Sequence, residues 1–185
     1  PARKKPSYNE RNVTDKPHSA RLRVQKKKTL QGLFLARIRS LASVDDAVAE
    51  TVQTLADSGE LDNTTIIFTS DNGYLLGEHR RIGKRQPYEE SVRVPMLARG
   101  PGFESSGASG QLASMLDLTP TFLELARATP GRVLDGRSLV GLSGVPSPDD
   151  RMTRLIQSGH DAWHKRGRLW DWRGVRERRY TFVHW

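Results

Sequence analysis

Apolar residues recur along residues 29–57 at steps of three, four or seven, the repeat of a helix with one apolar face. The stripe consists of Leu30, Phe34, Ile38, Leu41, Val48, Val52 and Leu55. Ser43 is a residue that can cap a second helical segment, which allows a break there. Ser58 and Gly59 mark the end of the helix, because glycine is common just beyond the last turn. The pattern predicts a long helix that buries one face.

The pattern then changes from helical to extended. Residues 64–70 are mostly β-branched or apolar, which predicts a buried strand, and residues 94–99 predict a second one. The charged residues 71–93 between them predict a loop. Further along, Thr119 and Pro120 are typical of a helix start, with threonine as the cap and proline at the first helical position. Residues 155–156 predict a short strand, and residues 173–183 predict a hairpin with its turn near 177–179.

This order of elements predicts the fold class. Helices and strands alternate in the first part and the tail is antiparallel, which indicates an α/β fold with an antiparallel appendage. We divide the chain into an irregular arm (1–28), an α/β core (29–150) and a C-terminal antiparallel segment (151–185). The arm has too few apolar residues to fold alone, so we expect it to lie on another part of the protein.

Length and composition narrow the possibilities. The 185 residues are enough for one domain with a core. No apolar run reaches the eighteen residues of a membrane span, and no apolar stretch follows the basic N-terminus as in a signal peptide. We therefore expect a soluble protein without a membrane partner, while the compartment stays open. The sequence lacks an initiator methionine, and we expect the natural start to lie upstream. With no cysteine, these residues hold no disulfide, thiolate metal site or cysteine nucleophile.

The predicted strand at 64–70 ends in a group of candidate metal ligands. Asp71 and Asn72 offer hard oxygen donors at adjacent positions, which suit Ca²⁺ or Mg²⁺ and no soft metal. Gly73 lets the chain turn there without a side chain in the way. Asp-Asn-Gly is also an ordinary turn sequence, so the residues alone leave both interpretations open. His79 and Lys84 follow in the charged loop.

The wider context of these residues carries a family resemblance. Residues 69–80, Gly83 with Lys84, and residues 88–95 together resemble the type I sulfatases of the alkaline phosphatase superfamily. The likeness is greatest to arylsulfatases and N-acetylglucosamine-6-sulfatases. Other segments resemble the family in the family's own order: 61–64, 99–102, 116–126, 134–139 and 174–180. Together they cover most of residues 30–183.

The resemblance implies a fold and roles for four residues. The fold would be part of an alkaline-phosphatase-like sandwich with a C-terminal antiparallel sheet and helix. Asp71 and Asn72 would be metal ligands, most often for Ca²⁺, with Mg²⁺ as the alternative. Lys84 would contact a sulfate oxygen as a catalytic and substrate-binding residue, because a positioned ammonium stabilises an anionic ester and its leaving oxygen. His79 would help to bind substrate, or would instead pack the loop.

The sequence departs from the family in one respect. Type I sulfatases carry a formylglycine made from Cys or Ser in a Cys/Ser-x-Pro/Ala-x-Arg motif, and this motif is absent here. The chain therefore resembles the C-terminal portion of a sulfatase. We expect the formylglycine to lie in a missing N-terminal half, which would be a partner of this chain. The chain alone should have negligible turnover.

Two other functions stay open. A phosphodiesterase or phosphonate monoester hydrolase of the same superfamily is one, although Asn72 in place of a histidine favours a sulfatase. The other is a non-catalytic basic module for anionic glycan or nucleic acid, which the net charge of +9 suggests. Four tryptophans near basic residues in the tail could stack on sugars or bases, although their spacings favour core or edge packing: Trp163, Trp170, Trp172 and Trp185. No nucleic-acid-binding motif is present. The expected ligand is a sulfated small molecule or glycan.

Overall fold

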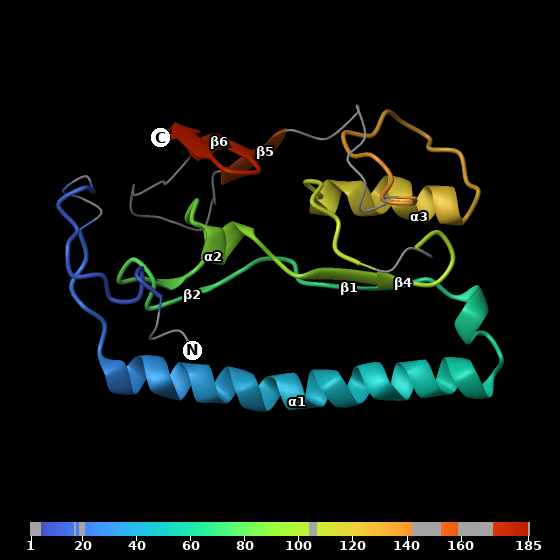
Figure 1. The fold of residues 1–185 in the computed structure, drawn as a ribbon, viewed down its shortest axis with the longest axis horizontal. Coiled ribbons are helices and arrows are strands. Elements are labelled where there is room, and N and C mark those ends of the chain that lie inside the picture. The colour runs from blue at the N-terminus through green and yellow to red at the C-terminus, as the bar shows by residue number, and fades with distance from the viewer. Residues whose placement is uncertain are drawn as a thin grey trace. The chain divides into compact units, whose positions relative to one another are not determined.

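The computed structural model describes residues 5–16, 18, 21–103, 107–141, 153–158 and 172–184. The chain forms two compact units, each with its own contacts. Unit 1 consists of Pro1–Leu61 and Asn72–Val94, and unit 2 consists of Asp62–Asp71 and Pro95–Trp185. Figure 1 shows the chain as a ribbon and labels many of its helices and strands. Within the described part of the chain, no helix has the length and apolar character needed to cross a bilayer.

Unit 1 is built on one long helix, α1 (Lys27–Asp57). The predicted helix is confirmed, and it ends at Ser58 and Gly59, whose φ of 75° suits a glycine. The possible break at Ser43 is absent, because the helix continues through it. Within α1 only Leu30 is fully buried, while other members of the predicted stripe such as Ile38 and Leu41 stay exposed.

The segment predicted as a loop contains three short elements. β2 (Leu75–Leu76) pairs antiparallel with β3 (Ile82–Gly83), and α2 (Glu89–Val92) follows. The loop prediction was therefore incomplete, since strands of two residues are too short to show a period. Leu75 and Leu76 are buried, as is Leu30 of α1, and these leucines form the apolar core of the unit.

The N-terminal arm lies on the β2–β3 hairpin, as expected from its low apolar content. Tyr8 forms an isolated antiparallel bridge with Glu78. The amide of Asn9 donates to the carbonyl of Gly77 at 2.8 Å, and the amide of His79 donates to the carbonyl of Ser7 at 2.8 Å. These backbone hydrogen bonds place the arm directly against the loop that carries His79.

The short helical turn η3 (Leu61–Asn63) starts on the last residue of the first segment of unit 1, and unit 2 begins within it at Asp62 and continues into a two-stranded sheet. In this sheet β1 (Ile66–Thr69) pairs antiparallel with β4 (Met96–Arg99). Both predicted strands are confirmed, but β1 is only half-buried and its Phe68 is exposed. The expected full burial of this strand was wrong for the described structure.

The next helix is α3 (Leu118–Leu125), which follows the short helical turn η4 (Met115–Asp117). Buried hydrogen bonds of one side chain, Thr121, hold it in place. Thr121 is fully buried; its hydroxyl donates to the carbonyl of Asp117 at 2.6 Å and accepts the amide of Leu139 at 2.9 Å. The predicted helix exists, but Thr119 is not its cap. Ser114 and Asp117 instead form a capping box at η4, so the helical turns begin earlier than the proline suggested.

The tail forms the predicted antiparallel sheet, with strands in the order β5 (Thr153–Ser158), β6 (Trp172–Glu177) and β7 (Thr181–His184). The hairpin prediction is confirmed by the pairing of β6 with β7. Trp172 is buried, as expected for a packing residue. Trp163, Trp170 and Trp185 lie outside the described residues. The division of the chain at residues 28 and 150 stays a prediction.

Candidate functional site

The chain changes units immediately after β1, at the predicted metal ligands. Asp71 is exposed and is the last residue of its segment in unit 2. Asn72 is half-buried and is the first residue of the second segment of unit 1. These two oxygen-bearing residues are therefore consecutive in sequence, and each is held by a different unit.

Gly73 follows them, and the structure explains why this position carries glycine. Its amide donates to the carbonyl of Ser91 at 2.9 Å. A Cβ atom at Gly73 would lie 2.2 Å from the carbonyl oxygen of Glu90, a backbone atom with little freedom to move. The close approach of α2, rather than a positive φ, requires glycine here. This contact fixes the start of the segment that carries His79 and Lys84.

Lys84 comes directly after β3, at the end of the hairpin. The preceding Gly83 has a φ of 118°, a conformation that other residues rarely adopt. The Lys84 side chain is exposed, and among the described residues it has no hydrogen bond or ion pair. Its ammonium is therefore available to an anion from outside.

His79 has a different environment on the same hairpin. Its ring stacks on Tyr88 with the ring centres 3.8 Å apart and 14° between the planes. Nδ1 lies 3.4 Å from Oε1 of Glu10, and Nε2 lies 3.8 Å from Oε2 of Glu90. Its φ of 51° is unusual for a residue other than glycine. These contacts give the ring a packing role, and they leave its role toward substrate as a prediction.

The network around Glu10 was missed by the sequence analysis. Nζ of Lys16 lies 2.8 Å from Oε1 of Glu10 and 3.2 Å from Oδ2 of Asp15. Burial of the ammonium lowers the pKa of Lys16, but hydrogen bonds and charge attraction to Glu10 and Asp15 together raise it above 10.5. Nothing in the local sequence indicated this cluster, because Glu10 and His79 are far apart along the chain.

Two further groups fix the hairpin, and they too escaped the sequence analysis. The guanidinium of Arg80 donates to three backbone carbonyls, those of Glu10, Arg11 and Leu22, each at 2.9 Å. Glu78 is buried, with Oε2 accepting the amide of Leu76 at 2.6 Å. The Arg80 bonds join the loop around His79 to the arm, whereas the Glu78 bond lies within the hairpin itself.

The oxygen-bearing side chains of Asp71 and Asn72 suit a hard cation in kind, but they are too few to surround it. Asp71 and Asn72 would supply two oxygens, whereas calcium takes six to eight. Among the residues that the structure describes, no three His, Asp or Glu side chains come together as they would around a metal ion. The residues present thus suit a calcium site to which other protein groups contribute.

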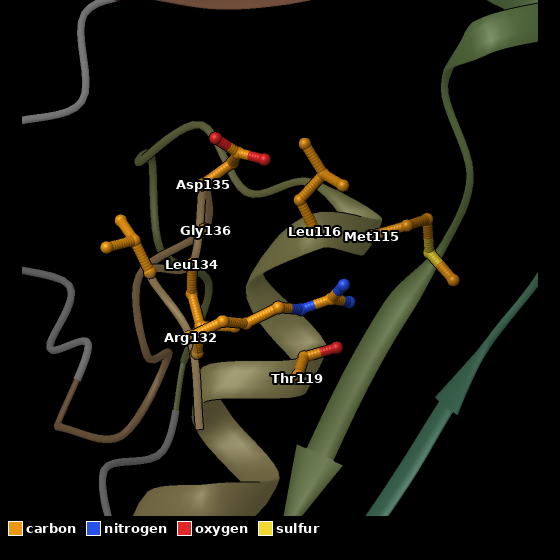
Figure 2. A pocket seen from close by; sticks show the side chains of 8 residues that line it. Met115, Leu116, Thr119, Arg132, Leu134, Asp135 and Gly136 are labelled. Atoms are coloured by element: carbon orange, nitrogen blue, oxygen red, sulfur yellow. The ribbon is translucent and has the colours of Figure 1, made fainter. Parts of the chain in front are cut away.

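A separate cavity lies in unit 2. It has a volume of about 310 Å³ beside η4 and the start of α3, and Figure 2 shows the Arg132 side chain extending across it toward Thr119. The other lining residues are Met115, Leu116, Val133, Leu134, Asp135 and Gly136. None of the four predicted site residues lines this cavity.

Two models of known protein families match this chain. The family model described as Sulfatase matches residues 4–128. The model described as N-sulphoglucosamine sulphohydrolase, C-terminal, matches residues 77–185.

Curated relatives and solved structures agree with this assignment. An arylsulfatase of Volvox carteri is 42% identical over 153 residues, covering 76% of this chain and 23% of the relative. An N-acetylglucosamine-6-sulfatase of Bos taurus is 42% identical over 118 residues, covering 63% of this chain and 20% of the relative. A structure solved with its substrate D-glucosamine-2-N,6-O-disulfate has a TM-score of 0.68 and 30% identity, covering 78% of this chain and 30% of that one.

The neighbours also include a phosphonate monoester hydrolase of Agrobacterium radiobacter, with a TM-score of 0.65 and 27% identity over 77% of this chain and 31% of that one. The chain spans less than a quarter of the length of the two curated relatives named above. The predicted α/β fold of the alkaline-phosphatase type is confirmed by these neighbours. The resemblance inferred over most of residues 30–183 is likewise confirmed, and the chain belongs to the sulfatase family.

Proposed function

We propose that this chain is the C-terminal part of a sulfatase that hydrolyses sulfate esters. The observation that carries the proposal is the family match over residues 4–128, which includes the Asp71-Asn72-Gly73 turn after β1 and Lys84 after β3. In this proposal the nucleophilic formylglycine belongs to another part of the enzyme. The 185-residue chain alone then has no turnover.

Each predicted residue has a chemical task in this proposal. Asp71 and Asn72 would hold calcium, which supplies positive charge beside the sulfate when it is bound. The exposed ammonium of Lys84 donates to a sulfate oxygen and stabilises the charge that develops as the ester bond breaks. His79 lies in the loop of the β2–β3 hairpin, between Glu10 and Glu90. In this proposal its ring helps to bind the substrate.

The proposed substrate is a sulfated amino sugar. Support comes from two similar proteins, the N-acetylglucosamine-6-sulfatase of Bos taurus and the structure solved with D-glucosamine-2-N,6-O-disulfate. Arylsulfatases are also among the similar proteins, so a simple aryl sulfate serves as the first assay substrate.

The test uses this chain joined to a formylglycine-bearing sulfatase half. Asp71→Ala and Lys84→Ala should each lower kcat on an aryl sulfate by about 10²–10³-fold, the typical loss of one positioned charge-stabilising group. Asp46→Ala and Lys28→Ala, two exposed positions on α1, make the same changes in charge and should leave the rate unchanged. Full activity in both site variants would refute the assignment of these residues.

A second candidate reaction is phosphonate monoester hydrolysis, which the similarity to the Agrobacterium radiobacter enzyme favours. Asn72 supports the sulfatase instead, since the phosphate-processing branch often carries histidine after the aspartate. Rates on matched sulfate and phosphonate monoesters separate the two. A higher kcat/KM on the phosphonate would reverse our choice.

A further inference from the structure

Asn72 and Gly73 form a pair with a covalent chemistry of its own. The side-chain amide of an asparagine can be attacked by the backbone nitrogen of the next residue, and glycine hinders this attack least because it has no Cβ atom. Among the four asparagines of the sequence, only Asn72 is followed by glycine. The three others precede residues with bulkier side chains: Asn9 before Glu10, Asn12 before Val13 and Asn63 before Thr64.

The reaction converts the amide of Asn72 to a carboxylate in two steps. The backbone nitrogen of Gly73 bonds to Cγ of Asn72, the Cγ–Nδ2 bond breaks, and the amide proton of Gly73 leaves with the departing NH₂ group as ammonia. Water then opens the resulting succinimide ring at either carbonyl, which yields aspartate or isoaspartate. Both steps use only the chain and water. The first step requires an N–H group at Gly73 that is not hydrogen-bonded and a peptide that can rotate toward Cγ.

In folded unit 1 neither requirement is met. The backbone N–H of Gly73 donates to the carbonyl of Ser91 at 2.9 Å, and Ser91 is only 6% exposed. The space beside Cα of Gly73 is also occupied, since a Cβ atom there would lie 2.2 Å from the carbonyl oxygen of Glu90. Both Ser91 and Glu90 belong to α2. The attack on Asn72 therefore requires α2 to move away from Gly73.

The helix α2 depends on contacts from outside it. It has four residues and no side-chain cap, and a helix of this length is not stable by itself. The hydroxyl of Ser7 in the arm donates to Oε1 of Glu90 at 3.1 Å, and Nε2 of His79 lies 3.8 Å from Oε2 of Glu90. The ring of His79 also stacks on Tyr88, the residue before α2. The arm and the hairpin loop thus hold α2 against Gly73.

We propose that Asn72-Gly73 is a site of spontaneous deamidation, which the arm and α2 keep unreactive in the folded protein. The site reacts only in molecules in which α2 has opened locally. Its rate is therefore set by the contacts of Ser7 and Glu90, which are remote from the reacting atoms in the sequence.

Deamidation would alter the candidate metal ligands. Aspartate at position 72 adds a negative charge next to Asp71, and isoaspartate adds one carbon atom to the backbone between Asp71 and Gly73. This consequence for calcium rests on the proposed function. The modification itself does not, because it needs neither a metal nor a substrate.

The test follows the 185-residue chain by peptide mapping and mass spectrometry during incubation at neutral pH. In guanidinium chloride, where the chain is unfolded, Asn72 should deamidate faster than Asn9, Asn12 and Asn63. In the native chain Asn72 should react about tenfold more slowly or less than in guanidinium chloride, as expected for a site that reacts only after local opening. The same mapping is done on the chain joined to a formylglycine-bearing sulfatase half, in EDTA so that no bound cation protects Asn72.

Two variants test the role of the contact between the arm and α2. Ser7→Ala removes the hydroxyl that bonds Glu90, and Glu90→Ala removes the carboxylate. Each should raise the native deamidation rate of Asn72 by about tenfold, the order expected for one hydrogen bond to a charged group. The rate in guanidinium chloride should not change. Ser7→Ala is the milder substitution and gives the result even where Glu90→Ala unfolds unit 1.

Matched controls lie on α1. Ser40→Ala and Glu50→Ala make the same chemical changes at exposed positions of this helix and should leave both rates unchanged. Circular dichroism at the start of each incubation shows which variants are folded.

Three results would overturn the inference. Equal rates at Asn72 in the native and unfolded chain would show that α2 gives no protection. Wild-type rates in Ser7→Ala and Glu90→Ala would show that the arm has no part in it. No preference for Asn72 over the other asparagines in the unfolded chain would remove the site altogether. An inactive joined enzyme with the expected deamidation rates would support this inference and refute only the proposed function.

Discussion

Gly73 shows how a single residue connects Asn72, one of the two proposed metal ligands, to the rest of unit 1. Its amide is bonded to the carbonyl of Ser91, and a side chain there would collide with the carbonyl oxygen of Glu90 at 2.2 Å. We predict that Gly73→Ala lowers the free energy of unfolding by about 1–3 kcal/mol, the usual cost of forcing an added carbon into packed structure. Urea denaturation followed by circular dichroism measures this change.

Gly32 provides the contrasting control. It lies inside α1, and a Cβ atom there would meet nothing within 4 Å. Gly32→Ala should therefore raise the free energy of unfolding by about 0.5–1 kcal/mol, because alanine loses less backbone entropy in a helix. If both substitutions changed stability in the same direction, the steric account of Gly73 would be wrong.

For single residues, the sequence indicated which side chains could carry chemistry, but it did not indicate which side chains lie next to them in space. Asp71, Asn72 and Gly73 were recognisable because they follow one another at a strand end. The contact between His79 and Glu10 was not, since 69 positions separate the two residues and each is an ordinary polar residue locally. Long-range ion pairs leave no pattern in a single sequence, so the packing of His79 became visible only in three dimensions.

Among the elements, the N-terminal arm and the β2–β3 hairpin depend on each other through Arg80. Its guanidinium bonds three arm carbonyls, those of Glu10, Arg11 and Leu22. Lysine keeps the charge but has no planar group with several donors. We predict that Arg80→Lys loosens the arm and exposes residues 5–16 to limited proteolysis several-fold faster than in the wild type.

The neighbouring Arg81 serves as the matched control. The structure gives no hydrogen bond or ion pair for its side chain among the described residues, and Arg81→Lys should leave the proteolysis rate unchanged. Hydrogen exchange at the amides of Asn9 and His79, which bond across the arm and the loop, provides a second measurement. Equal protection of these amides in Arg80→Lys and wild type would show that the arm is held by other contacts.

The same elements show where sequence patterns predict structure and where they do not. α1 was predictable because 31 residues repeat one local pattern, and β1 and β4 because each is a run of strand-forming residues. β2 and β3 were missed, since two residues each carry no period and their pairing depends on the arm and α1. The start of α3 was misplaced for a related reason: the Ser114–Asp117 capping box outweighed the threonine–proline signal.

At the scale of the whole molecule, the chain holds two candidate calcium ligands and spans 10–23% of the length of the curated relatives described as a SULF-1 homolog, an arylsulfatase and an N-acetylglucosamine-6-sulfatase. A site with two of six to eight oxygens binds calcium weakly, because most of the ion's hydration shell has no protein replacement. Calcium affinity should therefore appear only when the chain is joined to the rest of a sulfatase.

This expectation can be measured by thermal unfolding. A ligand that binds only the folded state stabilises it by about 2.7 kcal/mol when its concentration is 100 times the Kd. We predict that calcium, added to an EDTA-treated enzyme containing this chain and a formylglycine half, raises Tm, whereas the 185-residue chain alone shows no shift. Asp71→Ala should abolish the shift in the joined enzyme, while Asp46→Ala on α1 should retain it. A full shift in Asp71→Ala would mean that calcium binds elsewhere, and the strand-end turn would then have only a structural role.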